Sequence, residues 1–169
     1  MIEAALRVLA RDGVAATSHR SIALEADVPL GSTTYHFAGL DELVQAAFEK
    51  HVEMMADSFE ARLRAAAGPE EVVEALLDAA FEDLTASPEA LALTYELYGS
   101  AARRPEVRAL TEWWMARAHA ALRLHVDAET AEVLDVLLEG YMVHISISRR
   151  PPSRDEVRRG FQRVLDGAR

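Results

Sequence analysis

The chain has 169 residues, half of them apolar, and a formal net charge of −10. This length fits one compact unit or two small ones that share a core. The lack of Cys excludes disulfides, thiolate metal sites and thiol nucleophiles, and the acidic balance argues against a general nucleic-acid coat protein. No signal-peptide pattern and no run near the ~18 apolar residues of a membrane span is present, so we expect a soluble, cytoplasmic protein.

The composition favours an all-α fold, because Ala, Leu, Glu and Arg dominate and Gly and Pro are few. The helical spacing of apolar residues predicts about nine helices. Asp12-Gly13 ends the first, Ser18 is an N-cap for the second, and Pro29 ends that second helix. The first four helices are expected over residues 2–12, 18–28, 30–37 and 41–63.

In the second half of the chain, proline residues mark the starts of predicted helices, because Pro is tolerated in the first turn of a helix. Apolar stripes follow each of these starts, including a stripe from Val133 to Tyr141. The last five helices are expected over residues 70–86, 88–101, 105–125, 127–148 and 153–166.

Residues Ser18 to Phe37 have the layout of a helix-turn-helix. Reading DNA in this way needs a bracing helix, a tight turn, and a second helix whose short side chains can enter the major groove. Ile22 and Phe37 are placed to pack inward and fix the crossing of the two helices. The second helix offers the short or polar side chains of Leu30, Ser32, Thr33, Thr34 and His36.

Several short motifs occur together and in order around this segment: Gly13-Val14, the Ser18 cap, Ile22-Ala23, Val28-Pro29-Leu30-Gly31, Tyr35-His36-Phe37 and Asp41-Glu42-Leu43. With them, residues 1 to 48 resemble the N-terminal domain of the TetR (tetracycline-repressor-like) family. The resemblance implies a helix-turn-helix DNA-binding domain over 1–48 and a helical ligand-binding and dimerisation domain over 49–169. It carries DNA contacts onto Ser18, Arg20, Leu30, Ser32, Thr33, Tyr35 and His36, and a close approach to the DNA onto Gly31. Thr34 joins the predicted contacts because its hydroxyl can reach base edges or phosphates.

The implied function is a ligand-responsive transcriptional regulator, a repressor that a small molecule releases from a double-stranded DNA operator. Positive charge is scarce, however. Residues 1 to 50 carry a net charge of −3, Thr34 and Leu40 replace the Tyr and Lys that the family usually has, and the chain begins almost at its first helix, where the family has a basic arm. We therefore expect weak, salt-sensitive DNA binding. The alternative is a helical small-molecule sensor or interaction module whose DNA-binding domain binds DNA only weakly.

Large aromatic and half-polar side chains recur in the C-terminal helices, where ordinary core or dimer packing competes with a role in lining a ligand cavity. The candidates are Phe81, Tyr95, Tyr98, Trp113, Trp114, Tyr141 and His144. The last two helices have wide apolar faces, and Gly140 permits close approach. We therefore expect a homodimer that forms through these two helices.

The six His show no metal pattern, because none follows a Glu by three residues and His119 and His125 do not share a helix face. His51 is expected at a solvated or seam position of the long helix. No Gly-x-Ser-x-Gly nucleophile motif is present, and Gly31-Ser32 lacks a phosphate-loop Lys. We expect no metal, no cofactor and no enzymatic activity.

Overall fold

The computed structural model describes residues 1–83 and 88–167, with the side chains of Thr34 and Asp83 left out. This part of the chain forms nine α-helices, one π-helical segment and no strand, which confirms the all-α prediction. None of these helices is long and apolar enough to cross a membrane. The chain divides into two compact units.

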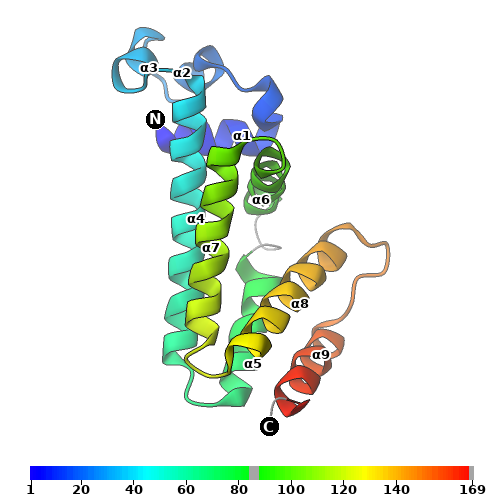
Figure 1. Cartoon of the computed structure of the whole chain (residues 1–169). Helices are drawn as coiled ribbons and strands as arrows, with labels where there is room; N and C mark the ends of the chain where they lie inside the picture. The colour runs from blue at the N-terminus through cyan, green and yellow to red at the C-terminus, as the bar shows by residue number, and fades with distance from the viewer. Residues whose placement is uncertain (84–87, 168–169) are drawn as a thin grey trace. The chain divides into compact units, whose positions relative to one another are not determined.

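Unit 1 consists of Met1–Met54 and Pro88–Glu112. Within it, α1 packs against α2 and against α6, a helix from much later in the chain (Figure 1). Its core is apolar and includes the fully buried side chains of Leu9, Ile22, Leu43, Phe48 and Leu97. Its helices are α1 Ile2–Ala16, α2 His19–Glu25, α3 Gly31–His36, the first part of α4 Leu40–Ala65, α6 Pro88–Ala101 and the start of α7 Pro105–Leu122.

Unit 2 consists of Met55–Ser87 and Trp113–Arg169, and it contains the remaining parts of α4 and α7. Here α9 packs against α5 and α8 (Figure 1). Its buried side chains include Leu63, Leu76, Leu122, Leu134 and Phe161. The further elements of this unit are α5 Pro69–Asp78, the π-helical segment Ala79–Asp83, α8 Ala128–Ile147 and α9 Arg154–Gly167.

Most predicted helix ends lie within two residues of the observed ones, and four differ for identifiable reasons. Helix α2 ends at Glu25, three residues before the predicted end, because Asp27 leaves the helical conformation. Helix α1 bends at Gly13 and continues to Ala16 instead of stopping. The regular helix predicted over 70–86 is wrong over residues 79–83, which are π-helical, because apolar spacing does not reveal one irregular turn. The end of that prediction, residues 84–86, lies outside the described residues. Helix α7 ends at Leu122, and hydrogen-bonded turns follow it.

Candidate nucleic-acid interface

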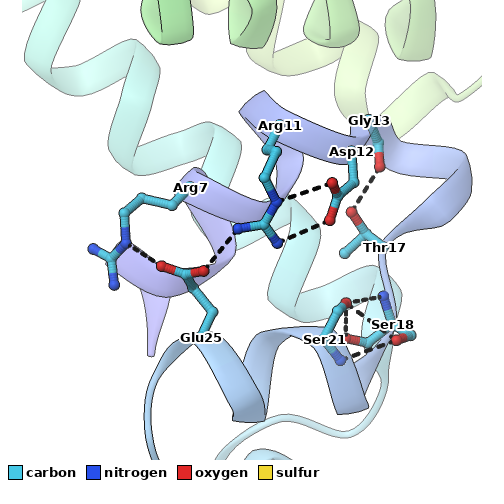
Figure 2. Close-up of polar contacts among 8 residues, drawn as sticks. All are labelled: Arg7, Arg11, Asp12, Gly13, Thr17, Ser18, Ser21 and Glu25. Carbon is cyan, nitrogen blue, oxygen red and sulfur yellow. Dashed lines mark hydrogen bonds and ion pairs between the residues drawn. The ribbon is translucent and has the colours of Figure 1, made fainter.

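The first helix of the predicted helix-turn-helix begins at a complete capping box. The Ser18 hydroxyl accepts a hydrogen bond from the backbone N–H of Ser21 at 3.1 Å, and the Ser18 backbone N–H donates to the Ser21 hydroxyl at 2.9 Å (Figure 2). Two of the N–H groups that the start of a helix leaves unpaired are thereby satisfied. The prediction that Ser18 caps α2 is confirmed.

The turn between the two helices is closed by the backbone. Asp27 adopts a left-handed conformation with φ of 53°, which Asp tolerates better than most residues. The N–H of Val28 donates to the Ala23 carbonyl at 3.0 Å, and the N–H of Asp27 donates to the Leu24 carbonyl at 3.2 Å. These two bonds form a Schellman motif. The sequence prediction relied on Pro29 alone and did not identify this role of Asp27.

The second helix, α3, is short and presents a mixed apolar and polar surface. Leu30 and Tyr35 are 52% and 84% exposed, and the Tyr35 ring lies edge-on to the exposed His36 ring, with 4.9 Å between their centroids. Thr33 is fully buried, and its hydroxyl donates to the Leu30 carbonyl at 2.8 Å. Leu30 and Tyr35 are large side chains that folding leaves in solvent, as expected of a surface that contacts a partner.

The nine predicted DNA contacts therefore differ in accessibility. Thr33 faces the interior, Ser32 is half-buried, and the side chain of Thr34 lies outside the described part of the structure. The exposed members of the set are Ser18, Arg20, Leu30, Gly31, Tyr35 and His36. Leu24, on α2, is also exposed but was not predicted. The sequence could have predicted the exposure of Leu24, because Ile22 and Ala23 face the core and the next residue of the helix then faces outward.

Two of the arginines in this region are engaged in ion pairs. Arg7 and Arg11 of α1 pair with the Glu25 carboxylate of α2 at 2.7 and 2.9 Å, and Arg11 also pairs with Asp12 at 2.9 Å (Figure 2). Their hydrogen bonds hold the pKa of Glu25 below its usual range, and the bond from Arg11 does the same for the pKa of Asp12. Within the described residues, Arg20 is exposed and forms no ion pair.

The seven candidate ligand residues are divided between the two units. Tyr95 and Tyr98 are half-buried in unit 1, and the others belong to unit 2. Tyr141 packs edge-on against Phe161 at 5.4 Å between centroids, and a Cβ at Gly160 would overlap its hydroxyl, so it joins α8 to α9. Gly160 thus permits a close approach of α8 and α9 within the unit.

The remaining candidates in unit 2 are Phe81, Trp113, Trp114 and His144. The Arg117 guanidinium lies 5.0 Å from the Trp113 ring centroid, and that of Arg154 lies 5.9 Å from the Phe81 ring centroid. Trp114 is half-buried and His144 is exposed. A cavity of about 540 Å³ in this unit is lined instead by Gly68, Pro69, Val72, Arg123, Leu124, His125, Val126, Asp127 and Leu165.

Three histidines have specific partners inside the units. His51 is buried, contrary to the solvated alternative, and its Nε2 lies 3.1 Å from the Thr94 hydroxyl. Burial lowers the pKa of His51 to about 4. His119 pairs with the buried Asp135 at 2.8 Å, and Nε2 of His125 lies 2.7 Å from the Leu63 carbonyl. The described residues contain no cluster of three or more metal-ligating side chains.

A capped helix, a backbone-closed turn and a second helix with an exposed mixed surface define a transcriptional regulator of the helix-turn-helix class. The family described as "Bacterial regulatory proteins, tetR family" matches residues 1–47, and "Tetracyclin repressor-like, C-terminal domain" matches residues 67–167. The chain belongs to the TetR family of transcriptional regulators. Members of this family are non-enzymatic DNA-binding proteins that act as dimers and bind small-molecule effectors.

Individual relatives agree with this assignment. The structure of SCO7518 from Streptomyces coelicolor A3(2) is 40% identical, with 96% of this chain and 94% of that chain covered and a TM-score of 0.89. The multidrug binding protein EbrR, solved in complex with ethidium, is 36% identical, with 96% and 95% covered and a TM-score of 0.80. The transcriptional regulator BetI of Rhizobium meliloti is 29% identical over 90% of this chain and 79% of its own length.

Proposed function

We propose that this chain is a ligand-responsive repressor that leaves its operator when a small molecule binds. The observation that carries the proposal is the exposed surface of α3 beside the capped start of α2, within the segment that matches the family's DNA-binding part. We assign DNA binding to residues 1–48, and ligand binding and dimerisation to residues 49–169. The place of action is the cytoplasm, where the operator lies.

Within the proposed DNA-binding surface, the side chains have different roles. Tyr35 and Ser18 contact phosphates, Leu30 and His36 reach base edges, and Arg20 supplies positive charge. Gly31 allows close approach of the backbone to the DNA, since no atom within 4 Å would meet a Cβ there. Ser32 adds a hydroxyl, and we keep Thr34 in the set as the sequence predicts. Thr33, being buried, supports α3 from within.

Dimerisation is proposed through the last two helices, with α8 as the main contributor. In α9, Val157, Phe161 and Leu165 are buried within the unit. Helix α8, in contrast, exposes Val133, Val136, Val143 and Ile147 at spacings of three, seven and four residues. This spacing places them on one face of the helix, with Gly140 between them. A second copy of the chain is the occupant that the family's dimers indicate.

We propose a flat aromatic cation as the effector. EbrR is solved with ethidium, and the acidic balance of this chain favours a cation. The proposed ligand-contacting residues in unit 2 are Phe81, Trp113, Trp114, Tyr141 and His144, and Tyr95 and Tyr98 stay separate candidates in unit 1. Titration with ethidium is expected to raise the melting temperature, because a ligand of the native state stabilises it by mass action. No thermal shift at millimolar ethidium would reject this class of effector.

DNA binding is tested with the DNA upstream of the chain's own gene, by fluorescence anisotropy at low and moderate salt. Tyr35→Ala is expected to weaken binding roughly tenfold, the scale of one lost specific contact, without a change in melting temperature, because Tyr35 is exposed. Tyr35→Phe keeps the ring and removes only the hydroxyl, so it should weaken binding about as much as Tyr35→Ala if the hydroxyl makes the phosphate contact. Failure of the wild type to bind at either salt would overturn the repressor proposal.

A second candidate function is a helical small-molecule sensor or interaction module whose DNA-binding domain has a weakened affinity for DNA. The ion pairs of Arg7 and Arg11 favour it, because paired arginines contribute less to attracting phosphate. An ethidium-dependent thermal shift in a protein that binds no DNA would support this second function.

A further inference from the structure

Helix α1 has a backbone irregularity just before the DNA-binding segment. Gly13 has φ of 74° and ψ of 168°, values that a residue with a side chain rarely adopts, and α1 bends there. The irregularity places the backbone N–H of Val14 so that it donates to Oε2 of Glu96 at 2.9 Å. Glu96 is on α6, 82 residues further along the chain.

The Glu96 carboxylate fits closely against this bend. A Cβ at position 13 would lie 2.9 Å from Glu96 Oε1 and 3.4 Å from its Cδ. Gly13 is therefore favoured for its positive φ, and a side chain at this position would displace the Glu96 carboxylate from the bend. Because the contact is partly buried, the hydrogen bond to the charged carboxylate is stronger than it would be in water.

Hydrogen bonds connect this contact to the start of α2. The Gly13 carbonyl accepts a hydrogen bond from the Thr17 hydroxyl at 2.7 Å (Figure 2). The Thr17 N–H donates to the Val14 carbonyl at 3.2 Å. Thr17 is buried, and the next residue, Ser18, is the N-cap of α2. The corner between α1 and α2 is thus held by hydrogen bonds among its own residues and by the hydrogen bond to Glu96 of α6.

We propose that Glu96 is a positioning residue for DNA binding, which sets the orientation of α2 and α3 by holding the Gly13–Val14 bend against α6. Glu96 itself touches no DNA in this proposal; it acts through the Val14 N–H. Elsewhere in unit 1, an ion pair joins Arg104, the residue before α7, to Asp41 in the first turn of α4. The inference rests on the DNA-binding surface proposed above.

The test compares Glu96→Ala with Glu71→Ala in the full-length chain. Glu71 is a matched control, since its carboxylate also accepts a backbone N–H, from Ala67 at 2.7 Å, but in unit 2. Glu96→Ala is expected to weaken DNA binding roughly tenfold, the ratio that corresponds to one charge-assisted hydrogen bond, whereas Glu71→Ala leaves affinity within about twofold. Glu96→Gln, which keeps an acceptor oxygen, is expected to restore most of the affinity.

Amide hydrogen exchange provides a readout that does not depend on DNA. In Glu96→Ala, the amides of Val14 and of α2 are expected to exchange faster, while those of α8 and α9 are unchanged. Unchanged exchange at Val14 and α2, or a loss of affinity no larger than that of Glu71→Ala, would overturn the inference, as would a Glu96→Gln variant as weak as Glu96→Ala. If the wild type binds no DNA, the proposed function fails, and the exchange result alone decides whether Glu96 holds this segment.

Discussion

The two compact units use their charged side chains differently. In unit 2, Glu60 is buried and pairs with Arg64 of the same helix at 2.6 Å and with Arg117 of α7, so its charge ties α4 to α7. In unit 1, Arg7 and Arg11 are 56% exposed and pair with Glu25 at the surface. Removing one partner of a buried ion pair lowers stability strongly, because the other charge stays buried and uncompensated. A surface ion pair contributes little to stability. Surface pairing in unit 1 therefore affects mainly what the surface can bind.

The units also leave different surfaces exposed. Unit 1 exposes separate large side chains, such as Leu30 and Tyr35, among hydroxyl groups. Unit 2 exposes a continuous apolar stripe along α8. The first surface suits a polar, grooved partner such as DNA, and the second suits another protein surface.

The largest effect is expected from Val136→Glu, which places a charge in the α8 stripe. Val136 is 70% exposed in the single chain, so the variant should fold. A charge within the proposed dimer interface should separate the dimer. Two linked DNA-binding segments bind far more tightly than one, so DNA affinity should fall by roughly 10²–10⁴-fold. Light scattering and anisotropy, measured on the same samples, check both parts of this prediction.

Leu124→Glu is the matched control for this substitution. Leu124 is 61% exposed and belongs to unit 2, but it lies beyond the end of α7 and outside the α8 stripe. It should leave both the dimer and the DNA affinity unchanged. A Val136→Glu protein that remains dimeric would show that the apolar stripe on α8 is not the dimer interface.

The next effect concerns His51, the buried titratable group of unit 1. Burial lowers its pKa from 6.5 to about 4, so below pH 6.5 the unfolded chain binds a proton that the folded chain does not. Stability is therefore lost as the pH falls from 6.5 to 4, by about 3 kcal/mol in total. Denaturant unfolding of wild type and His51→Gln across this range checks the effect. The variant should lose less stability than the wild type, and parallel curves would contradict the assignment.

Asp135, the buried carboxyl of unit 2, should show the opposite sign. Burial, with the nearby charge of Glu139, raises its pKa above 3.8 despite the opposing effect of His119. The folded state therefore favours the protonated acid, a contribution present below pH 3.8 and lost as the pH rises through the raised pKa. Unfolding curves of Asp135→Asn should show less stabilisation on acidification than the wild type does. A change in the same direction as for His51→Gln would break this contrast between the units.

The sequence predicted most of the helices because proline positions, Asp12-Gly13 and the Ser18 cap are local signals. It did not predict the partners of Glu96 or His51, since both belong to contacts between residues more than 40 positions apart. It also placed Thr33 among the DNA contacts, because polarity alone does not show which side of a six-residue helix is buried. In the same way, the apolar spacing of α9 did not reveal that its stripe is used within the unit.

The smallest effect is expected from Glu25→Gln, which releases Arg7 and Arg11 from their shared carboxylate. These side chains are exposed, so the melting temperature should change little. If ion pairing limits the positive charge of this segment, the variant should bind DNA a few-fold more tightly, and its salt dependence should steepen by about one unit of slope for each new phosphate contact. Anisotropy titrations at several salt concentrations measure both quantities. Weaker binding with an unchanged slope would instead mean that Glu25 serves to hold α2 against α1, and that the surface pairs of unit 1 are structural after all.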